Sequence, residues 1–315
     1  MNISIVIPAY NEAKNIKTTI NELFTTLENL DPVQMRCLDT ASVQDSFEII
    51  VVDDHSSDDL FDVVQGMHDS RVKCLRLSKR SGSHIALRAG IKEAAGNIVL
   101  YISADGQDNP ACLEDMLKKW RNGAKVVWAV RKDRHNEPFN TRKKAELFYK
   151  ILAWLGGTGK TNIDISKADF CLLDKTAVNA LNECTERNTS LLGLITWLGF
   201  SQDSVEYERR TRMSGKSKWS FKTHIGLAKD WLIGFSGSPL ILMCITGLFI
   251  LASGILYIAL KVITNSPIES WSLVMLVVLV LGGIQMIMLG IIGEYLWRNL
   301  DESRKRPLFY IEKRS

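Results

Sequence analysis

The sequence predicts an α/β domain with a mostly parallel sheet flanked by helices, followed by an interfacial helix and two transmembrane helices. Short apolar runs alternate with polar, helix-like stretches over residues 1 to about 235. Two apolar stretches of about 23–25 residues then follow, Leu240–Val262 and Ser272–Leu296, and a bilayer core needs about 20 helical residues. Because 23% of the residues are charged, the chain as a whole is neither disordered nor embedded in lipid.

Five apolar runs predict strands that are buried on both faces, as in a parallel sheet covered by helices. They are Ile3–Ile7, Phe47–Val52, Val72–Leu77, Asn97–Ile102 and Lys125–Val130. Helices are expected between them, from about Asn11 to Leu30, at Leu60–His68 and at Ser83–Ala95, with a polar loop at Asp31–Asp45. Strands that alternate with helices form right-handed crossovers, which predicts a mostly parallel sheet.

Polar residues follow three of these strands directly, in Tyr10-Asn11-Glu12, Asp53-Asp54 and the turn from Asp105 to Asp108. Ligands of such sheets bind beyond the carboxyl ends of the strands, so the three clusters predict one site. The carboxylate of Asp105, with Gln107 near it, suits a hard cation such as Mg²⁺ or Mn²⁺. The other interpretation of Asp108 is an N-cap for a helix that starts near Pro110. No Gly-x-Gly-x-x-Gly follows the first strand, which disfavours dinucleotide binding.

The C-terminal third predicts attachment to a membrane. We expect a cytoplasmic domain over residues 1–221, an interfacial amphipathic segment over 222–238, a two-helix hairpin over 239–297 and a cytoplasmic tail over 298–315. Basic residues precede the first apolar stretch and follow the second, whereas the connection Ile263–Trp271 carries none, so both termini are expected in the cytoplasm. The first residues enter a strand pattern at once, and we expect no signal peptide.

Charge and cysteine content exclude two classes of function. A formal net charge of +4 over 315 residues is too small to indicate nucleic-acid binding. The six cysteines have neither close pairing nor metal-type spacing, which favours reduced cytosolic thiols.

Three motifs resemble the successive signatures of glycosyltransferase family 2, whose fold is of the GT-A type. They are Ile7-Pro8-Ala9-Tyr10-Asn11-Glu12, Val51-Val52-Asp53-Asp54-His55-Ser56 and Ala104-Asp105-Gly106-Gln107-Asp108. Later segments are similar to the polyprenyl-phosphate branch of that family, which includes dolichol-phosphate mannose synthase, GtrB-type glucosyltransferases and ArnC. These are Val130–Arg134, Ala168–Asp174, Gly293–Leu296 and Arg306–Leu308.

The resemblance implies an inverting, metal-dependent transfer of a sugar from a nucleotide-sugar to a polyprenyl phosphate at the cell (inner) membrane, for cell-envelope glycan or lipid modification. It also implies a homo-oligomer, and uridine diphosphate as the nucleotide. Pro8, Tyr10 and Glu12 would line the nucleotide pocket. Asp54 would accept a hydrogen bond from the base, with Asp53 nearby.

The remaining roles implied by the resemblance concern the cation and the acceptor. Asp105 would ligate Mg²⁺ or Mn²⁺, with Gln107 near it. Asp169 would lie beside the acceptor and Arg131 would face phosphate. Because the acceptor is anionic, it also needs cations, and arginine can bind phosphate with two parallel hydrogen bonds. The candidates are Arg209, Arg210, Arg212 and Lys218, although this basic stretch could instead bind lipid headgroups.

Three positions depart from the family pattern. Ser103-Ala104-Asp105 stands where the family has Asp-x-Asp, Arg80-Ser81-Gly82-Ser83 where it has Asn-x-Gly-Lys, and Asp169-Phe170-Cys171 where it has Asp-Phe-Arg. These departures suggest an unusual sugar or a weak enzyme. They also leave open a membrane glycosyltransferase with a different acceptor and a non-catalytic nucleotide-sugar-binding homologue. A processive polysaccharide synthase is disfavoured, since the chain has no Gln-x-x-Arg-Trp motif.

Overall fold

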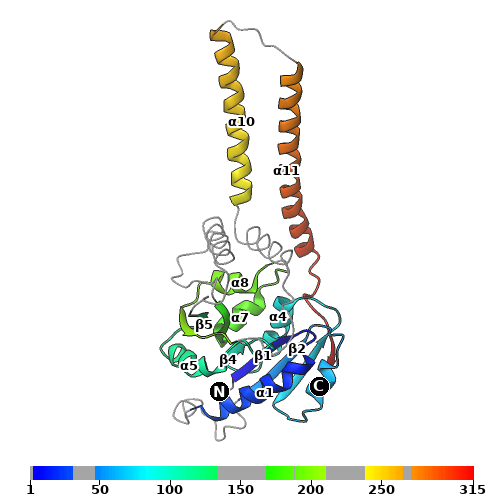
Figure 1. The fold of residues 1–315 in the computed structure, drawn as a ribbon, viewed down its shortest axis with the longest axis vertical. Helices are drawn as coiled ribbons and strands as arrows, with labels where there is room; N and C mark the ends of the chain where they lie inside the picture. Colours follow the sequence, from blue (N-terminus) through cyan, green and yellow to red (C-terminus); the bar gives the residue numbers. More distant parts are fainter. Residues whose placement is uncertain (1–2, 31–46, 133–167, 188, 211–237, 265–270) are drawn as a thin grey trace.

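In the computed structural model, one sheet forms the centre of the globular part of the molecule (Figure 1). The structure describes all residues except 1–2, 31–46, 133–167, 188, 211–237 and 265–270. The strands are β1 (Ile3–Ala9), β2 (Phe47–Asp53), β3 (Val72–Leu77), β4 (Ile98–Tyr101), β5 (Val126–Arg131), β6 (Ala168–Asp174), β7 (Gln202–Tyr207) and β8 (Ile311–Arg314). Their order across the described sheet is β7-β5-β6-β4-β1-β2-β3-β8.

The predicted α/β fold with a mostly parallel sheet is confirmed. β1 pairs in parallel with β2 and β4, β2 with β3, and β5 with β7. β6 is antiparallel to both β4 and β5, and β8 is antiparallel to β3. The amino end of β6 therefore lies at the same sheet edge as the carboxyl ends of β1, β2, β4, β5 and β7.

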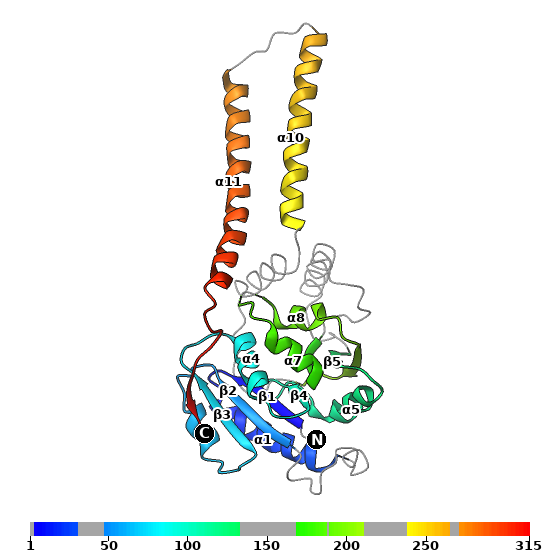
Figure 2. The same cartoon turned by 180° about the vertical axis from the view of Figure 1, so that it is seen from behind.

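Helices cover both faces of the sheet (Figure 2). They are α1 (Ala13–Glu28), α3 (Leu60–Gln65), α4 (Ser83–Glu93), α5 (Leu113–Arg121), α7 (Lys175–Glu183) and α8 (Leu191–Trp197), with a short 3₁₀ helix at Pro110–Cys112. Figures 1 and 2 show α4, α7 and α8 on the side of the sheet that faces the hairpin, and α1 on the other side. The core between these layers is apolar, with buried side chains such as Ile5, Val51 and Trp128.

Gly90 sets how closely α4 packs on the sheet. A Cβ atom at this position would lie 2.3 Å from Val6 Cγ1 and 2.9 Å from Val52 Cγ2. Both distances are well below van der Waals contact, so a side chain here would push α4 away from β1 and β2. Glycine thus fixes α4 against the two strands whose ends carry the first two polar clusters.

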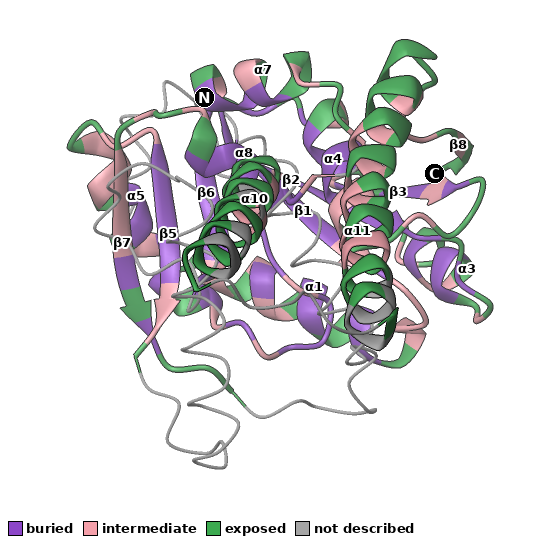
Figure 3. Cartoon of the chain, turned by 90° about the horizontal axis from the view of Figure 1, so that it is seen from above, coloured by how far each residue is buried: buried purple, intermediate pink, exposed green. Residues whose placement is uncertain are grey.

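Two long helices rise from the domain, α10 (Ser238–Ile263) and α11 (Trp271–Ser303). Their bounds match the two predicted apolar stretches, and α11 continues beyond the second. Many of their large apolar side chains are exposed, among them Phe249 and Met286. Seen from above, much of the described length of both helices is coloured as exposed (Figure 3). By length and composition, both helices are candidates to cross a membrane. The interfacial segment expected over 222–238 lies outside the described residues, apart from Ser238.

The C-terminal residues differ from the simple tail expected over 298–315. After α11 the chain returns to the domain, and Ile311–Arg314 adds β8 beside β3. The Cys74 amide donates to Ser315 Oγ at 2.8 Å, and the Ser315 amide donates to the Cys74 carbonyl at 3.0 Å. The charged run Ile-Glu-Lys-Arg did not predict a strand because it borders solvent on an edge, where alternation is weak.

Candidate active site

The site begins with Asp53 and Asp54, which end β2 at the predicted edge. Asp53 is completely buried. Its Oδ1 accepts from the Ser56 amide at 2.7 Å, and its Oδ2 pairs with Arg76 Nη1 at 2.7 Å. The side chain of Asp53 therefore orders this turn through Ser56 and Arg76.

Asp54 holds the loop between β3 and α4. Its Oδ1 accepts from the Ser81 amide at 2.6 Å and its Oδ2 from the Gly82 amide at 2.8 Å. Burial raises the pKa of the Asp54 carboxyl, although these two amides and Arg80 act in the opposite direction. Gly82, with φ of +93°, adopts a conformation that glycine tolerates best, which lets two successive amides point at one carboxylate.

The turn after β1 packs against the same loop. Tyr10 follows β1, and the Arg80 guanidinium stacks over its ring at 4.0 Å from the centroid. Asn11 has φ of +53°, and its Oδ1 accepts from the Ser57 amide at 2.8 Å. Glu12 Oε2 accepts from Asn15 Nδ2 at 2.7 Å. Pro8 lies in β1, opposite Val52 of β2. The ends of β1 and β2 and the Arg80 loop thus form one connected wall, which we name the β1–β2 turn region.

Asp105 lies in the turn after β4 and is almost fully buried. Its Oδ1 accepts from Ser103 Oγ at 2.8 Å and from the Gln107 amide at 3.1 Å. Between them, Gly106 has φ of +70°, which closes the turn tightly around the carboxylate. The serine that replaces the family's first carboxylate therefore binds and orients the second.

The interpretation of Asp108 as a helix cap is wrong. The N-cap of the helix at Pro110–Cys112 is Asn109, whose side chain accepts from the Ala111 amide at 3.1 Å. Asp108 points inward instead, where its Oδ2 accepts from the Ser103 amide at 2.8 Å. Burial raises the pKa of the Asp108 carboxyl, and the nearby carboxylate of Asp169 acts in the same direction.

Asp169, at the amino end of β6, lies next to this turn. Its Oδ2 forms an ion pair with Arg131 Nε at 2.6 Å and accepts a hydrogen bond from the Tyr207 hydroxyl. Tyr207 Oη also lies 3.3 Å from Asp108 Oδ1, so one phenol links the two carboxylates. Burial raises the pKa of Tyr207 well above its ordinary value, and the phenol stays protonated at neutral pH.

Arg209 and Arg210 follow β7, and Arg209 contacts the same group of residues. Arg209 Nη2 donates to Gln107 Oε1 at 3.0 Å, and its Nη1 lies 3.9 Å from Asp169 Oδ1. Arg210 is used differently, because its guanidinium pairs with Glu22 and donates to Asn109 Oδ1 at 2.9 Å. We name Asp105, Asp108, Asp169, Arg131, Tyr207 and Arg209 the acidic cluster.

The structure thus brings together Asp105, Gln107, Asp169, Arg131 and Arg209, as the sequence predicted, but turns Arg210 toward α1. Arg212 and Lys218 lie outside the described residues. Sequence reasoning missed Tyr207, which no motif marks, and the structural use of Ser103. The only available signal for Tyr207 was its position just before the basic run that begins at Arg209.

The donor atoms present fit a cation only in combination with a phosphorylated ligand. Among the described residues, no group of three His, Cys, Asp or Glu side chains could hold a metal ion. Magnesium, however, is commonly bound by one or two carboxylates together with substrate phosphates. The almost fully buried Asp105, already oriented by Ser103 and the Gln107 amide, suits that arrangement.

The sequence matches two family models, one within the globular domain and one over the two long helices. Residues 4–171 match the model of glycosyl transferase family 2, and residues 238–298 match the GtrB C-terminal hairpin. The chain belongs to glycosyltransferase family 2. The matched region of this family member contains the β1–β2 turn region and most of the acidic cluster, and the hairpin match coincides with α10 and α11.

Curated relatives are similar over nearly the whole length of this family member. The "Uncharacterized glycosyltransferase YkcC" of Bacillus subtilis (strain 168) is 34% identical, with 98% of this chain and 93% of the relative covered. The "Bactoprenol glucosyl transferase" of Shigella phage SfV is 30% identical, with 99% and 98% covered. The "Prophage bactoprenol glucosyl transferase homolog" of Escherichia coli (strain K12) is 29% identical, with 99% of each chain covered.

Proposed function

We propose that this glycosyltransferase moves a sugar from a nucleotide-sugar, most simply a UDP-sugar, to a polyprenyl phosphate with inversion at the anomeric carbon. The observation that carries the proposal is the similarity, hairpin included, to relatives named for bactoprenol glucosyl transfer. The product would be a polyprenyl-phosphate-sugar for cell-envelope glycan or lipid modification. The acidic cluster supports this assignment, because it combines carboxylates with cations that suit an anionic acceptor.

On the donor side, we assign the base to the wall formed by Pro8, Tyr10, Glu12 and Asp54. A carboxylate accepts a hydrogen bond from a ring N–H, as uracil offers, and Asp54 is held in place by two amides. Asp53 acts indirectly by fixing the turn through Arg76. The stacked pair of Arg80 and Tyr10 would close the side of the pocket.

On the acceptor side, an oxygen of the lipid phosphate attacks the anomeric carbon. The new bond forms between that oxygen and the carbon, while the bond to the nucleotide diphosphate breaks and its electron pair leaves with the diphosphate. The acceptor phosphate has a second pKa of about 6 and is already largely ionised at neutral pH. It needs no strong base, so Asp169 orients the acceptor or removes a residual proton, while Arg131 and Arg209 bind its charge.

The departing diphosphate carries negative charge that must be neutralised. A divalent cation, Mg²⁺ or Mn²⁺, would supply Lewis-acid stabilisation of that charge when bound. Asp105 is the residue that would hold it, with Gln107 near the same position and Ser103 fixing the carboxylate. Arg212 and Lys218 remain candidates for the acceptor phosphate.

We further propose that the chain is a multi-pass inner-membrane protein, with residues 1–221 as the cytoplasmic catalytic domain. Residues 222–238 would lie on the membrane, 239–297 would cross it as a hairpin, and 298–315 would return to the cytoplasm. The return of β8 to the sheet supports the last point, because both ends of the hairpin must then lie on the domain's side. A homo-oligomer assembled through the hairpin completes the proposal.

A screen of nucleotide-sugars against undecaprenyl phosphate tests the function. Full-length protein in nanodiscs is supplied with each donor and Mg²⁺, and mass spectrometry records the lipid. A lipid mass increased by one sugar, with release of the nucleoside diphosphate, is the expected result. Donor hydrolysis or binding without any glycosylated lipid across the screen would overturn the acceptor assignment and favour another acceptor or a non-catalytic homologue.

Topology is tested separately with a cysteine introduced at Ser266 in a variant whose native cysteines are replaced. An impermeant thiol reagent should label this residue from outside intact cells. Labelling only after the cytoplasmic side is opened would refute the hairpin.

A further inference from the structure

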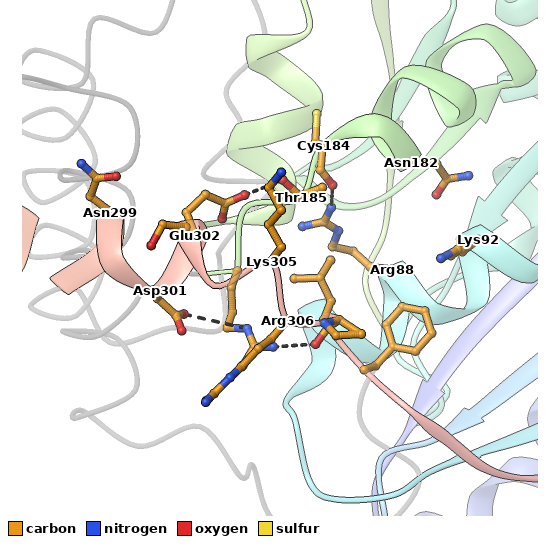
Figure 4. A pocket seen from close by; sticks show the side chains of 15 residues that line it. Arg88, Lys92, Asn182, Cys184, Thr185, Asn299, Asp301, Glu302, Lys305 and Arg306 are labelled. Carbon is orange, nitrogen blue, oxygen red and sulfur yellow. Dashed lines mark hydrogen bonds and ion pairs between the residues drawn. The ribbon is translucent and has the colours of Figure 1, made fainter. Parts of the chain in front are cut away.

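A cavity lies at the foot of α11. Its volume is about 790 Å³, and it is formed where the end of α11 and the segment after it meet α4 and the end of α7 (Figure 4). None of Asp54, Asp105 and Asp169 lines it. It includes Arg306-Pro307-Leu308, a motif with no part in the mechanism above.

The lining of this cavity, which we name the α11-foot cavity, carries an excess of positive charge. Five basic side chains contribute to it, Arg88, Lys92, Arg187, Lys305 and Arg306. Two acidic side chains oppose them, Asp301 and Glu302. The formal balance is five positive minus two negative charges, or +3.

Only part of that positive charge is used inside the protein. Arg88 donates to the backbone carbonyls of Cys184 and Glu186, and Arg187 lies 3.9 Å from Asp301. In the part of the chain that the structure describes, Lys92, Lys305 and Arg306 form no ion pair. All three are exposed, and the Lys92 ammonium lies 5.8 Å from the centre of the Phe309 ring.

The acidic residues do not cancel these cations. Glu302 accepts a hydrogen bond from Thr185 Oγ1 at 2.5 Å, and Asp301 faces Arg187. Figure 4 shows both interactions as dashed lines on the α11 side of the cavity. Lys92 extends from α4, on the opposite side from α11, so an anion between the two sides would meet basic groups from two separate segments.

The position of the cavity along α11 indicates how far it lies from the membrane, and therefore which anion could reach it. The apolar part of α11 ends near Glu294, and Trp297 follows it, a residue type that concentrates at membrane–water interfaces. Six residues, about 9 Å of helix, separate Trp297 from Ser303 at the rim of the cavity. The polar layer of a bilayer adds about 5–8 Å on each side of the hydrocarbon, so the cavity lies close to headgroup depth.

We propose that the α11-foot cavity binds the phosphate headgroup of an anionic membrane phospholipid through Lys92, Lys305 and Arg306. This inference depends on the proposed crossing of the membrane by α11 but not on the transferase reaction. Basic pockets on the cytoplasmic side of membrane helices are suited to such headgroups. Leu308 and Phe309 add apolar surface for the part of the lipid next to the phosphate. A bound lipid would hold the segment after α11 against α4.

Native mass spectrometry of the full-length protein in detergent tests the proposal. The protein is titrated with phosphatidylglycerol or phosphatidylcholine, and the lipids retained per chain are counted. We expect wild-type protein to retain one phosphatidylglycerol in preference to phosphatidylcholine. Replacing the two of these cations that follow α11, Lys305→Gln with Arg306→Gln, should weaken that retention about tenfold or more.

The matched control removes two exposed lysines elsewhere, Lys17→Gln with Lys118→Gln, and should retain phosphatidylglycerol like wild type. Equal retention by the cavity variant and wild type, or an equal loss in the control, would overturn the proposal. A third arm adds inorganic phosphate at millimolar concentration. If phosphate alone binds the wild-type cavity and displaces the lipid, the site takes free phosphate and the headgroup assignment is wrong. Because the readout is binding, a negative result in the transferase screen would leave this test intact.

Discussion

The β1–β2 turn region and the acidic cluster lie on the same edge of one sheet and both depend on carboxylates, but they use them differently. In the β1–β2 turn region, Asp53 and Asp54 bind backbone amides and one arginine, and their oxygens hold the surrounding loops. In the acidic cluster, Asp105 and Asp108 also accept from one backbone amide each, but Asp108 and Asp169 in addition share the hydroxyl of Tyr207 beside Arg131.

This difference separates two tasks that a transferase needs. Carboxylates that accept from fixed amides make a rigid surface, which suits recognition of a planar base. Carboxylates that lie beside arginines in a partly buried site interact strongly with other charges. A small change in the charge of a ligand therefore changes its binding energy there by a large amount. Under the function proposed above, we therefore expect donor recognition in the first region, and cation and acceptor binding in the second.

The largest effect is expected from the acidic cluster at Asp105. Asp105→Asn should lower transfer by about 10³-fold and weaken nucleotide-sugar binding in the presence of Mg²⁺, because the charge facing the diphosphate's cation is lost. Steady-state transfer and donor binding with and without Mg²⁺ measure this. Full activity of the wild type in excess chelator, or of the variant in Mg²⁺, would remove Asp105 from the metal site.

A smaller loss is expected at Asp169, about 10²-fold in turnover, at the lower end for proton-transfer groups because the acceptor is already ionised. If Asp169 acts as a base, the deficit of Asp169→Asn should shrink as pH rises above about 6, the second pKa of the acceptor phosphate. If it only orients the acceptor, the deficit should not change with pH. A pH series of turnover from 5.5 to 8.5 distinguishes the two roles, and activity equal to wild type would rule out both.

Tyr207 should matter less than the carboxylate it binds. Tyr207→Phe removes a hydrogen bond to Asp169, whereas Arg131 still pairs with that carboxylate, so turnover should fall about tenfold. Since the phenol's pKa is raised well above its ordinary value, the shape of the pH profile between 6 and 9 should not change. A change in that shape, with turnover retained, would mean that Tyr207 itself titrates.

The smallest effect concerns stability and Asp108. Burial raises its pKa in the folded protein above the unfolded value, so the wild type loses stability as pH rises between those two pKa values. Relative to Asp108→Asn, the wild type should therefore become more stable as pH falls, with a difference of about 1 kcal/mol or less at pH 7. Urea unfolding in detergent at pH 5 and 7 measures the free energy of unfolding of both proteins. If the wild type instead gained stability relative to Asp108→Asn as pH rises, the raised pKa of the buried Asp108 carboxyl would be contradicted.

The same comparison explains what the sequence could predict. The β1–β2 turn region follows contiguous motifs after parallel strands, where strand pattern and sheet geometry locate each residue, and Asp53 and Asp54 lie where expected. The acidic cluster needs β6 to run backwards between β4 and β5, and no periodicity in the chain specifies that pairing. Tyr207 reaches Asp169 only through this pairing. Arg210 pairs with Glu22 of α1, which is distant in the sequence, so no local pattern predicts that contact. The orienting contact of Ser103 is local, but a serine at this position carries no motif that marks it.

Donor affinity in two matched variants, Asp54→Asn and Asp169→Asn, tests the division of the site most directly. Isothermal titration calorimetry with the donor identified in the screen gives the dissociation constant for each variant in the presence of Mg²⁺. Asp54→Asn should bind the donor about tenfold more weakly than wild type, because a hydrogen bond to a charged group is lost. Asp169→Asn should bind the donor within about twofold of wild type, because an interaction made only on the way to the transition state leaves ground-state binding unchanged. A collapse of donor affinity in Asp169→Asn, with Asp54→Asn unaffected, would contradict the division.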